Sequence, residues 1–393
     1  MTTGPAGFVP PPYPYDRLKE ITSLAESFGG GAAGGGAADG GAVDLSIGTP
    51  HDPPPPAVVA ALAGSGTERG YPPSIGTPAF RSAVSDWFAR RFAVDVEPET
   101  IGAAVGTKEL VAGIPHWLRL RDPSRDTVLY PAISYPSYAM GATLAGARAV
   151  PVPVDERWRL DLAAIDPADA ARALCLWCNT PGNPAGGLDD LAAVAEWGRA
   201  HGVPVLSDEC YVEFTWSGTP VVAGQQPGHT VLESGPAGVL AVHSLSKRSN
   251  LAGVRVGYYA GDPDLVRYLQ EVRKHAGLMV PGPAQAAGVA ALADQTAVDE
   301  QRLRYRTRLE RMAGVLAQLG IDAPLPDGGF YLWVPAPGGD AWTLARRLAQ
   351  DLGVVSSPGE FYGPSAADHV RLAMVQPDAA MDLVERRVAR LTG

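Results

Sequence analysis

Residues 239–260 read VLAVHSLSKRSNLAGVRVGYYA, and the organisation of the whole chain follows from this stretch. Its two short apolar runs, 239–242 and 256–260, are bounded by polar and glycine residues, which is typical of buried β-strands. Lys247 lies just beyond the first run, and Arg255 lies just before the second. The stretch therefore predicts a lysine and an arginine at the ends of two neighbouring strands.

The polar residues between these runs carry groups suited to one ligand. Ser244, Ser246 and Arg255 can face a single anion, since arginine grips a phosphate through two parallel hydrogen bonds. A lysine among apolar walls and other cations loses its proton more easily and can form a Schiff base with a carbonyl, which is the functional interpretation of Lys247. The alternative is a solvated loop lysine beside a structural arginine, and the rest of the chain has to decide between them.

The composition is that of a globular chain with an acidic balance. Its 393 residues suffice for about two domains, and 46% hydrophobic with 19% charged residues is not a disordered composition. A net charge of −10 without a basic run argues against nucleic acid and anionic membrane surfaces as partners. No apolar run approaches membrane-spanning length and no signal-peptide pattern opens the chain, so we expect a cytoplasmic protein without membrane contacts.

The three cysteines give no sign of a disulfide or of a metal site. Cys175 and Cys178 form a CxxC inside the apolar run ALCLWCN, and residues three apart on a strand point to opposite faces. No second CxxC completes a zinc site, and Cys210 stands apart. We expect three ordinary buried cysteines and no metal.

Strand and helix patterns alternate through the first two thirds of the chain, which predicts an α/β fold with a mostly parallel sheet and helices on both faces. Ligands of such sheets bind beyond the carboxyl ends of the strands. After residue 260 the pattern changes to long helices and a few strands, typical of a smaller α+β domain. The predicted strands of the sheet are 101–105, 127–130, 147–154, 173–178, 203–206 and 239–242.

These patterns divide the chain into three parts. Residues 1–45 form an N-terminal arm and part of the small domain, residues 46–290 form the large cofactor-binding domain, and residues 291–393 form the C-terminal small domain. Residues 29–41 are nearly all glycine and alanine, which is typical of a flexible loop. We favour a tolerated insertion over a mobile lid for this loop.

Several polar residues fall just beyond the predicted strands, and they can converge on one pocket at the sheet edge. They offer an anion cradle, a flat aromatic ring, a carboxylate, two hydrogen-bonding groups and an amine. A phosphorylated aromatic aldehyde with a ring nitrogen uses all of these, and pyridoxal phosphate is that molecule. The residues are Thr107, Tyr135, Asn183, Asp208, Tyr211, Ser244, Lys247 and Arg255.

Each of these residues also has an ordinary structural interpretation. Asp208 and Thr107 can cap helices, Tyr135 can belong to the core, and Asn183 can form a plain turn with the proline after it. These interpretations do not predict that all of them stand at strand ends, so we favour the cofactor site. A Rossmann dehydrogenase would need GxGxxG after the first strand, and residues 106–108 do not supply it.

From residue 43 to Arg371 the sequence resembles the class I/II aminotransferases of the fold type I pyridoxal-phosphate family. Residues 179–187, NTPGNPAGG, are similar to the family's N-P-x-x-P-T-G-type stretch. Residues 208–211, DECY, are similar to its D-E-x-Y, and residues 244–257, SLSKRSNLAGVRVG, to its S-x-S-K…G-x-R-x-G. Together these motifs are highly specific, and they imply a ping-pong transamination with pyridoxal phosphate between an amino acid and a 2-oxo acid.

The resemblance implies a role for each residue around the cofactor ring. Lys247 forms the Schiff base and later shuttles the proton, and Asp208 holds the pyridine nitrogen protonated. Tyr211 and Asn183 bond the ring hydroxyl, and Tyr135 stacks on the ring. The phosphate is held by backbone amides and side chains of Thr107, Lys108, Ser244, Ser246 and Arg255.

The resemblance also implies a substrate clamp and a partner subunit. Arg371 matches the arginine that binds the substrate α-carboxylate, and Gly48 matches a glycine that lines this clamp. Tyr71 matches a tyrosine that reaches the phosphate of the neighbouring subunit, so a homodimer with shared active sites is implied.

Within the family, the chain is most similar to bacterial N-succinyl-LL-2,6-diaminopimelate aminotransferases of lysine biosynthesis, which use glutamate and 2-oxoglutarate as the other pair. The similarity lies in DLSIGTPHDP, GYPPSIGTPAFR, GTKELVAGIP and HSLSKRSNLAG. The unmatched loop 29–41 and the proline-rich segment 51–56 leave other amino acids open, including aromatic ones and acetylornithine, as well as a carbon–sulfur lyase. A non-catalytic cofactor-binding regulator would need a DNA-binding module, and no helix-turn-helix pattern is present.

Overall fold

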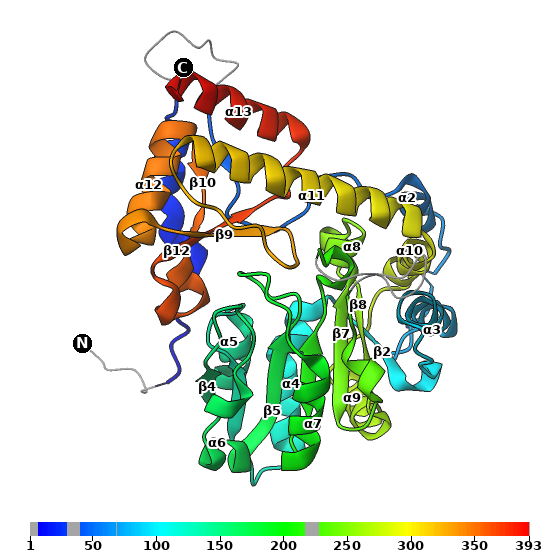
Figure 1. Ribbon diagram of the computed structural model, residues 1–393. Coiled ribbons are helices and arrows are strands. Elements are labelled where there is room, and N and C mark those ends of the chain that lie inside the picture. The colour runs from blue at the N-terminus through cyan, green and yellow to red at the C-terminus, as the bar shows by residue number, and fades with distance from the viewer. Residues whose placement is uncertain (1–6, 30–39, 68, 217–227, 393) are drawn as a thin grey trace, which may run out of the picture.

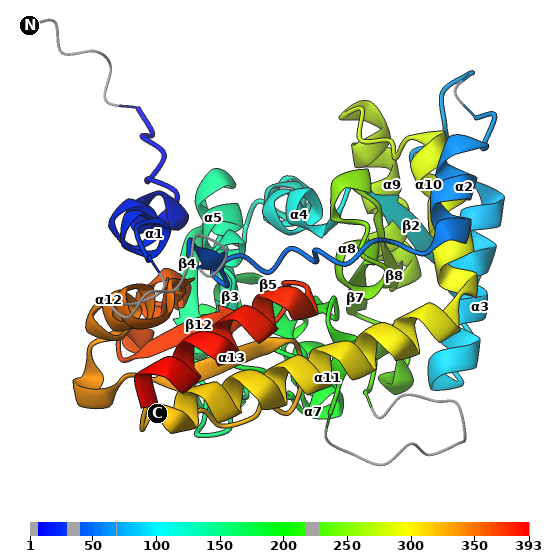
Figure 2. The ribbon, with the colours of Figure 1, turned by 90° about the horizontal axis from the view of Figure 1, so that it is seen from above.

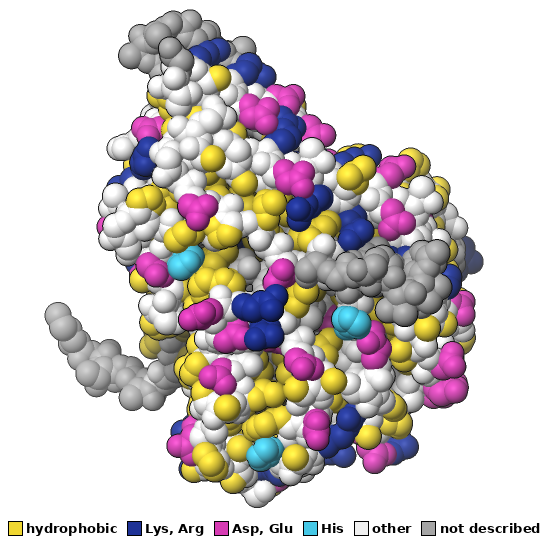
Figure 3. All heavy atoms as spheres, viewed as in Figure 1, with side chains coloured by type: hydrophobic (Ala, Val, Ile, Leu, Met, Phe, Trp, Pro, Cys, Tyr) yellow, Lys and Arg dark blue, Asp and Glu magenta, His cyan; other side chains and the backbone are white. Residues whose placement is uncertain are grey.

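The structure is a computed structural model that describes residues 7–29, 40–67, 69–216 and 228–392 (Figure 1). Most of the glycine- and alanine-rich segment expected to be a loop, residues 30–39, lies outside the described residues. Charged side chains of both signs are intermixed on the face shown in Figure 3. None of the described helices is both long and apolar enough to cross a membrane.

The larger part of the molecule is built on one seven-stranded sheet. The strand order is β2-β8-β7-β6-β5-β3-β4, and β8 is antiparallel to both of its neighbours while the other pairs are parallel. A parallel neighbour needs a long crossover, and only residues 245–256 separate β7 from β8, so the chain returns antiparallel. The strands are β2 Ile101–Ala104, β3 Thr127–Pro131, β4 Arg148–Val152, β5 Ala173–Asn179, β6 Val205–Asp208, β7 Val239–Ser244 and β8 Gly257–Gly261.

Helices cover both faces of this sheet, as the alternating pattern predicted. One hydrophobic cluster joins the sheet to α3, α7 and α10, and another joins its opposite face to α4, α5 and α9. Cys178 belongs to the first cluster and Cys175 to the second, so the two side chains do point to opposite faces. The helices are α2 Pro56–Ala63, α3 Pro78–Phe92, α4 Thr107–Arg121, α5 Ser137–Leu144, α6 Pro167–Arg172, α7 Leu191–His201, α8 Leu245–Arg248, α9 Pro263–His275 and α10 Gly282–Ala293.

The smaller part combines both ends of the chain around a separate hydrophobic cluster. A three-stranded antiparallel sheet has the order β11-β12-β9, and β1 pairs with β10 in parallel. The domain boundaries expected after residues 45 and 290 stay a prediction. The elements are α1 Lys19–Glu26, β1 Val43–Asp44, α11 Gln295–Gln318, β9 Tyr331–Pro335, α12 Ala341–Leu352, β10 Val354–Val355, β11 Ser357–Pro358, β12 His369–Ala373 and α13 Asp378–Thr392.

Short 3₁₀ helices complete the fold, and three of them lie close to residues expected in the site. Pro14–Leu18 opens the described arm, Val212–Phe214 follows Tyr211, and Ala252–Val254 precedes Arg255. The others are Pro98–Thr100, Leu162–Ala164, Val231–Ser234, Pro337–Gly339, Gly359–Tyr362 and Pro364–Ala366.

An extended segment connects the smaller part to the larger one. Residues 46–53, here called the strap, run from the end of β1 towards α2 across the molecule (Figure 2). The sequence favours a short strand or an extended segment over residues 43–47, and strand β1 ends at Asp44, whose carboxylate accepts hydrogen bonds from the amide and hydroxyl of Ser46, at 2.8 and 2.6 Å. Such local side-chain bonds compete with strand pairing.

Candidate active site

A cavity of about 520 Å³ opens where the strand ends of the large sheet meet the smaller part of the molecule. All of the residues expected in the site line this cavity except Tyr71. The expected residues brought together are Gly48, Thr107, Lys108, Tyr135, Asn183, Asp208, Tyr211, Ser244, Ser246, Lys247, Arg255 and Arg371. Residues that sequence reasoning missed also line it: Tyr13, Tyr15, Tyr138, Asn179, Cys210 and Tyr331.

Lys247 lies in α8, the single helical turn that follows β7. Its ammonium donates a hydrogen bond to the carbonyl oxygen of Gly48 in the strap. Burial lowers the pKa of Lys247 to about 8, and the positive charges of Arg371 and Arg255 add to this effect. A lysine with a pKa near neutrality can act as a nucleophile and as a base.

Asp208 ends β6 and is buried at the floor of the cavity. Tyr138 donates a hydrogen bond to its Oδ2 at 2.8 Å, and the amide of Cys210 donates to its Oδ1 at 3.2 Å. Burial raises the pKa of Asp208, and the hydrogen bonds from Cys210 and Tyr138 oppose that rise. A carboxylate held in this way is suited to a cationic partner, which would compensate for its lost hydration.

The opposite end of the cavity is suited to an anion. Thr107 and Lys108 open α4, so their amides lie at a helix N-terminus that favours negative charge. A Cβ added to Gly106 would overlap the Arg255 guanidinium, so only glycine lets the chain approach that group so closely. Arg255 has φ +59°, a left-handed conformation rare outside glycine and found mainly at functional sites.

Two neighbouring strand ends carry hydrogen-bonding groups into the cavity. Asn179 binds the carbonyl oxygen of Asp208 through its Nδ2 at 2.9 Å and accepts from the amide of Asn183 at 2.8 Å. This local arrangement ties the loop after β5 to the end of β6. The hydroxyl of Tyr211 lies 2.9 Å from the hydroxyl of Tyr331 on β9, which connects the large sheet to the small one.

Arg371 on β12 is buried and faces the cavity from the smaller part. Its Nη1 donates to Asn183 Oδ1 at 2.8 Å, and its Nη2 donates to the carbonyl oxygen of Ser46 and to the Tyr15 hydroxyl. The guanidinium carbon lies 4.2 Å from the ring centroid of Tyr331. Among the described residues, Nε of Arg371 is buried without a hydrogen-bond partner, and the residue lines the cavity.

The N-terminal arm supplies an aromatic wall that the sequence did not reveal. The Lys108 ammonium lies 3.3 Å from the Tyr13 hydroxyl, and the rings of Tyr13 and Tyr15 are 5.4 Å apart. The only sequence signal was the tyrosine-rich composition of this arm. Tyr138 could have been suspected, since it follows the expected site residue Tyr135 by three positions, whereas no motif lies beside Tyr331.

Tyr71 is the one expected site residue that the cavity does not include. Its side chain is 96% exposed in the single chain. A role for Tyr71 at the phosphate of a second subunit requires such exposure and remains untested by one chain.

The donor set fits pyridoxal phosphate. The cavity holds an anion cradle at Thr107 and Arg255, a buried carboxylate at Asp208 and a half-buried amine at Lys247, all lining one space. The ring of Tyr135 lines the same space. These are the groups that a phosphate, a pyridine nitrogen, an aldehyde and a flat ring require.

Comparison with known proteins gives the family. The family description "Aminotransferase class I and II" matches residues 41–387. A probable aminotransferase of Mycobacterium tuberculosis is 40% identical over 97% of this chain and 85% of its own length. The 4-dedimethylamino-4-oxo-anhydrotetracycline transaminase of Streptomyces rimosus is 38% identical over 97% of this chain and 99% of its own length.

A solved structure has the same fold over nearly the whole chain. It is a probable N-succinyldiaminopimelate aminotransferase of Thermus thermophilus, with a TM-score of 0.81, 28% identity, and coverage of 95% of this chain and 99% of that one. The family is dependent on pyridoxal phosphate, for which the cavity supplies a matching set of groups. The chain belongs to the class I and II aminotransferases.

Proposed function

We propose that this aminotransferase acts on N-succinyl-LL-2,6-diaminopimelate in lysine biosynthesis, with glutamate and 2-oxoglutarate as the second pair. The observation that best supports a transamination reaction is that Lys247, Asp208 and Arg371 line the same cavity. The similarity to the Thermus thermophilus protein, together with the motifs around the strap and Lys247, supports the substrate.

We propose these roles for the chain's own groups. Arg371 binds the substrate α-carboxylate through its guanidinium, and Asn183 keeps the guanidinium oriented through the 2.8 Å bond. Lys247 Nζ moves the proton at the substrate α-carbon, which its lowered pKa favours. Asp208 holds a proton on the ring nitrogen through its buried carboxylate, and Tyr211 binds the ring hydroxyl.

Pyridoxal phosphate, when bound, supplies the aldehyde that takes up the amino group and the cationic ring that accepts the electron pair. The anion end orients it, because the α4 amides, Ser244, Ser246 and Arg255 all favour a phosphate there. Tyr135 stacks on its ring. Burial of the cavity floor excludes water, which strengthens the pairing of Asp208 with a cation.

A homodimer completes this proposal. The exposed Tyr71 would reach the phosphate in the neighbouring subunit, and a cytoplasmic location suits the proposed substrate. Tyr71→Phe should then weaken cofactor binding only in the dimer, which links its effect to assembly.

A substrate panel tests the function. The cofactor-loaded protein is assayed with 2-oxoglutarate and N-succinyl-LL-diaminopimelate, LL-diaminopimelate, acetylornithine or aromatic amino acids. Release of pyruvate, ammonia and a thiol from cysteine S-conjugates is measured for a lyase. We expect kcat/KM for the succinylated substrate to exceed the others by at least about tenfold, which corresponds to about 1.4 kcal/mol of transition-state binding. A higher value for any other member of the panel would overturn the proposed substrate.

A second candidate is transamination of a ketone on a polycyclic scaffold. The 38% identity to the Streptomyces rimosus transaminase, over nearly the full length of both chains, favours it. Adding such a ketone to the panel, with glutamate as the amino donor, distinguishes the two candidates. Turnover of the ketone with little activity on succinylated diaminopimelate would favour this alternative.

A further inference from the structure

The strap forms one wall of the active-site cavity through Ile47, Gly48 and Thr49. Its first half is held by groups of the site. The carbonyl oxygen of Ser46 accepts hydrogen bonds from Arg371 and, at 2.8 Å, from the Ser357 hydroxyl. A Cβ added to Gly48 would overlap the Tyr331 hydroxyl, so the strap already lies as close to this tyrosine as the backbone allows.

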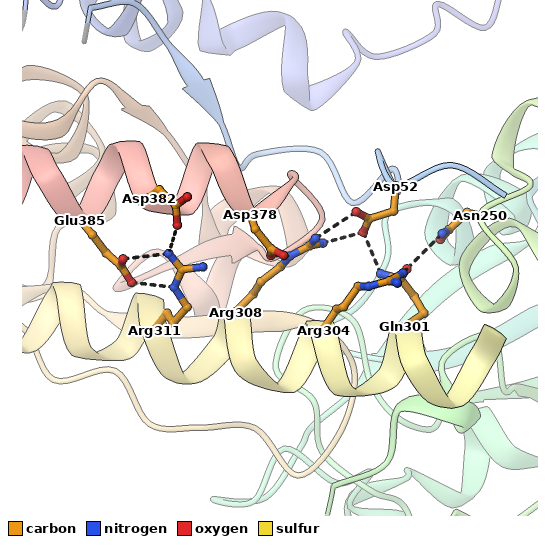
Figure 4. A network of polar contacts seen from close by, with 9 residues as sticks. All are labelled: Asp52, Asn250, Gln301, Arg304, Arg308, Arg311, Asp378, Asp382 and Glu385. Atoms are coloured by element: carbon orange, nitrogen blue, oxygen red, sulfur yellow. Dashed lines mark hydrogen bonds and ion pairs between the residues drawn. The ribbon is translucent and has the colours of Figure 1, made fainter. Parts of the chain in front are cut away.

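At the far end of the strap, the Asp52 carboxylate holds the segment to α11 (Figure 4). Its two oxygens accept from Nη1 and Nη2 of Arg308 at 2.6 and 2.9 Å, and Gln301 Nε2 donates to Oδ2 at 2.8 Å. The side chains of Arg308 and Asp52 are only 1% and 12% exposed, so this two-pronged ion pair is largely shielded from water. Both partners of Asp52 come from α11.

The same contacts reach the loop that follows Lys247. Gln301 Oε1 accepts from Asn250 Nδ2 at 3.2 Å, and Asn250 also approaches the carbonyl oxygen of Pro53 at 3.5 Å. Asn250 stands three residues beyond Lys247 with φ +55°, so this turn has little freedom to adjust. Asp52 therefore joins the strap to α11, and its partner Gln301 continues the contacts to the loop that follows Lys247.

Asp52 is the side chain that ties this end of the strap to α11, and the amide of His51 beside it donates to the carbonyl oxygen of Val375 at 3.1 Å. The strap therefore lies directly against Tyr331 at Gly48 and is bound to Arg308 at Asp52. Replacing a buried ion pair by apolar residues is often neutral for stability, so a stabilising role alone explains this pair poorly. A fixed position of the strap explains it better.

We propose that Asp52 is a positioning residue for the amino-acid carboxylate. By holding the strap on α11, it keeps the Ser46 carbonyl against Arg371 and Gly48 against Tyr331, so the guanidinium is already oriented when substrate enters. Asp52 touches neither substrate nor cofactor, and it acts through Arg371.

The test is Asp52→Asn, which preserves the shape of the side chain and removes its charge. We expect KM for the amino-acid substrate to rise about tenfold while kcat changes by less than about threefold. The reason is that the variant weakens binding of the substrate carboxylate by Arg371 but leaves the groups that carry out the reaction in place. The dissociation constant of the cofactor, measured by equilibrium dialysis, should stay within about twofold, since the anion end is untouched.

Asp378→Asn is the matched control. Asp378 binds Nε of the same Arg308 at 2.7 Å but is 60% exposed and does not contact the strap. Its KM should stay within about twofold of wild type. An unchanged KM in Asp52→Asn, or an equal rise in Asp378→Asn, would overturn the proposal.

Gln301→Leu covers the case in which Asp52→Asn does not fold. This variant leaves the Arg308 pair intact but removes the bonds of Gln301 to Asp52 and Asn250. We expect KM to rise about threefold with kcat unchanged, a loss of under about 1 kcal/mol. A folded Gln301→Leu protein with wild-type KM, melting within a few degrees of wild type, would contradict the positioning role.

Discussion

The two ends of the cavity are built in different ways. The anion end comes from two short stretches, residues 106–108 and 244–255, and both belong to the edge of one sheet. The carboxylate end is assembled around Arg371 from contacts with Tyr15, Ser46 and Asn183, which are 356, 325 and 188 residues away in sequence.

This difference has a functional consequence. The anion end is held within the large sheet, so a change there should affect cofactor binding alone. The carboxylate end joins the arm, the strap, the loop after β5 and the small sheet, so substrate binding depends on how the two parts of the molecule meet. Variants at each end, and at Lys247 between them, can separate the two contributions.

The largest effect is expected at Lys247, which serves both ends. Lys247→Met should lower kcat at least about 10⁴-fold, because both the nucleophile and the base are removed. The visible absorbance of the lysine-linked cofactor should disappear while phosphate-dependent binding persists. Turnover within tenfold of wild type would contradict the assignment of Lys247.

Although Lys247→Met should abolish activity, we expect it to stabilise the fold of the cofactor-free protein. The ordinary lysine pKa of 10.5 falls to about 8 here, so the buried charge destabilises the folded state fully below pH 8 and progressively less as pH rises towards 10.5. Lys247→Met should therefore raise the free energy of unfolding at pH 7 by up to about 3 kcal/mol. Urea unfolding at pH 7 and 10 measures this gain, which should shrink at the higher pH.

The next effect separates the two ends directly. Arg371→Gln should raise KM for the amino acid about 50-fold, because a charged bidentate contact is lost, and leave cofactor affinity unchanged. Arg255→Gln, its counterpart at the anion end, should weaken cofactor binding about tenfold with KM nearly constant at saturating cofactor. Titrations of both variants with cofactor and with substrate test these expectations. Weaker cofactor binding in Arg371→Gln, or a raised KM in Arg255→Gln at saturating cofactor, would show that the two ends are not independent.

The sequence predicted what is encoded locally. Asp208, Lys247 and Arg255 each lie at or near the end of a strand of the sheet. The alternation of strands and helices along the chain was therefore enough to predict that these residues meet at one edge of the sheet. The α/β class and the mostly parallel sheet followed from the same alternation and are confirmed. The antiparallel turn of β8 explains why Arg255 returns to the edge where Ser244 ends β7.

The rest depended on contacts between distant segments, which no local pattern contains. Tyr15 meets Arg371 across 356 residues, and Asp52 meets Arg308 across 256. In the sequence, Asp52 is one residue of the proline-rich segment 51–56, and no motif singles out Tyr138. The positioning role of such a polar residue can be recognised only when the structure shows which distant residue it contacts.

The smallest effect is expected at Tyr138, whose hydroxyl donates to Asp208 at 2.8 Å and is fully buried. Tyr138→Phe removes one of the hydrogen bonds that oppose the burial-induced rise in the Asp208 pKa, so this pKa should rise further. We expect kcat to fall about threefold to tenfold, with a larger loss at low pH where Asp208 begins to protonate. Tyr130→Phe, a half-buried tyrosine outside the cavity lining, is the control. A pH profile of kcat with the same acidic limb in Tyr138→Phe and wild type would show that Tyr138 only fills space beside Asp208.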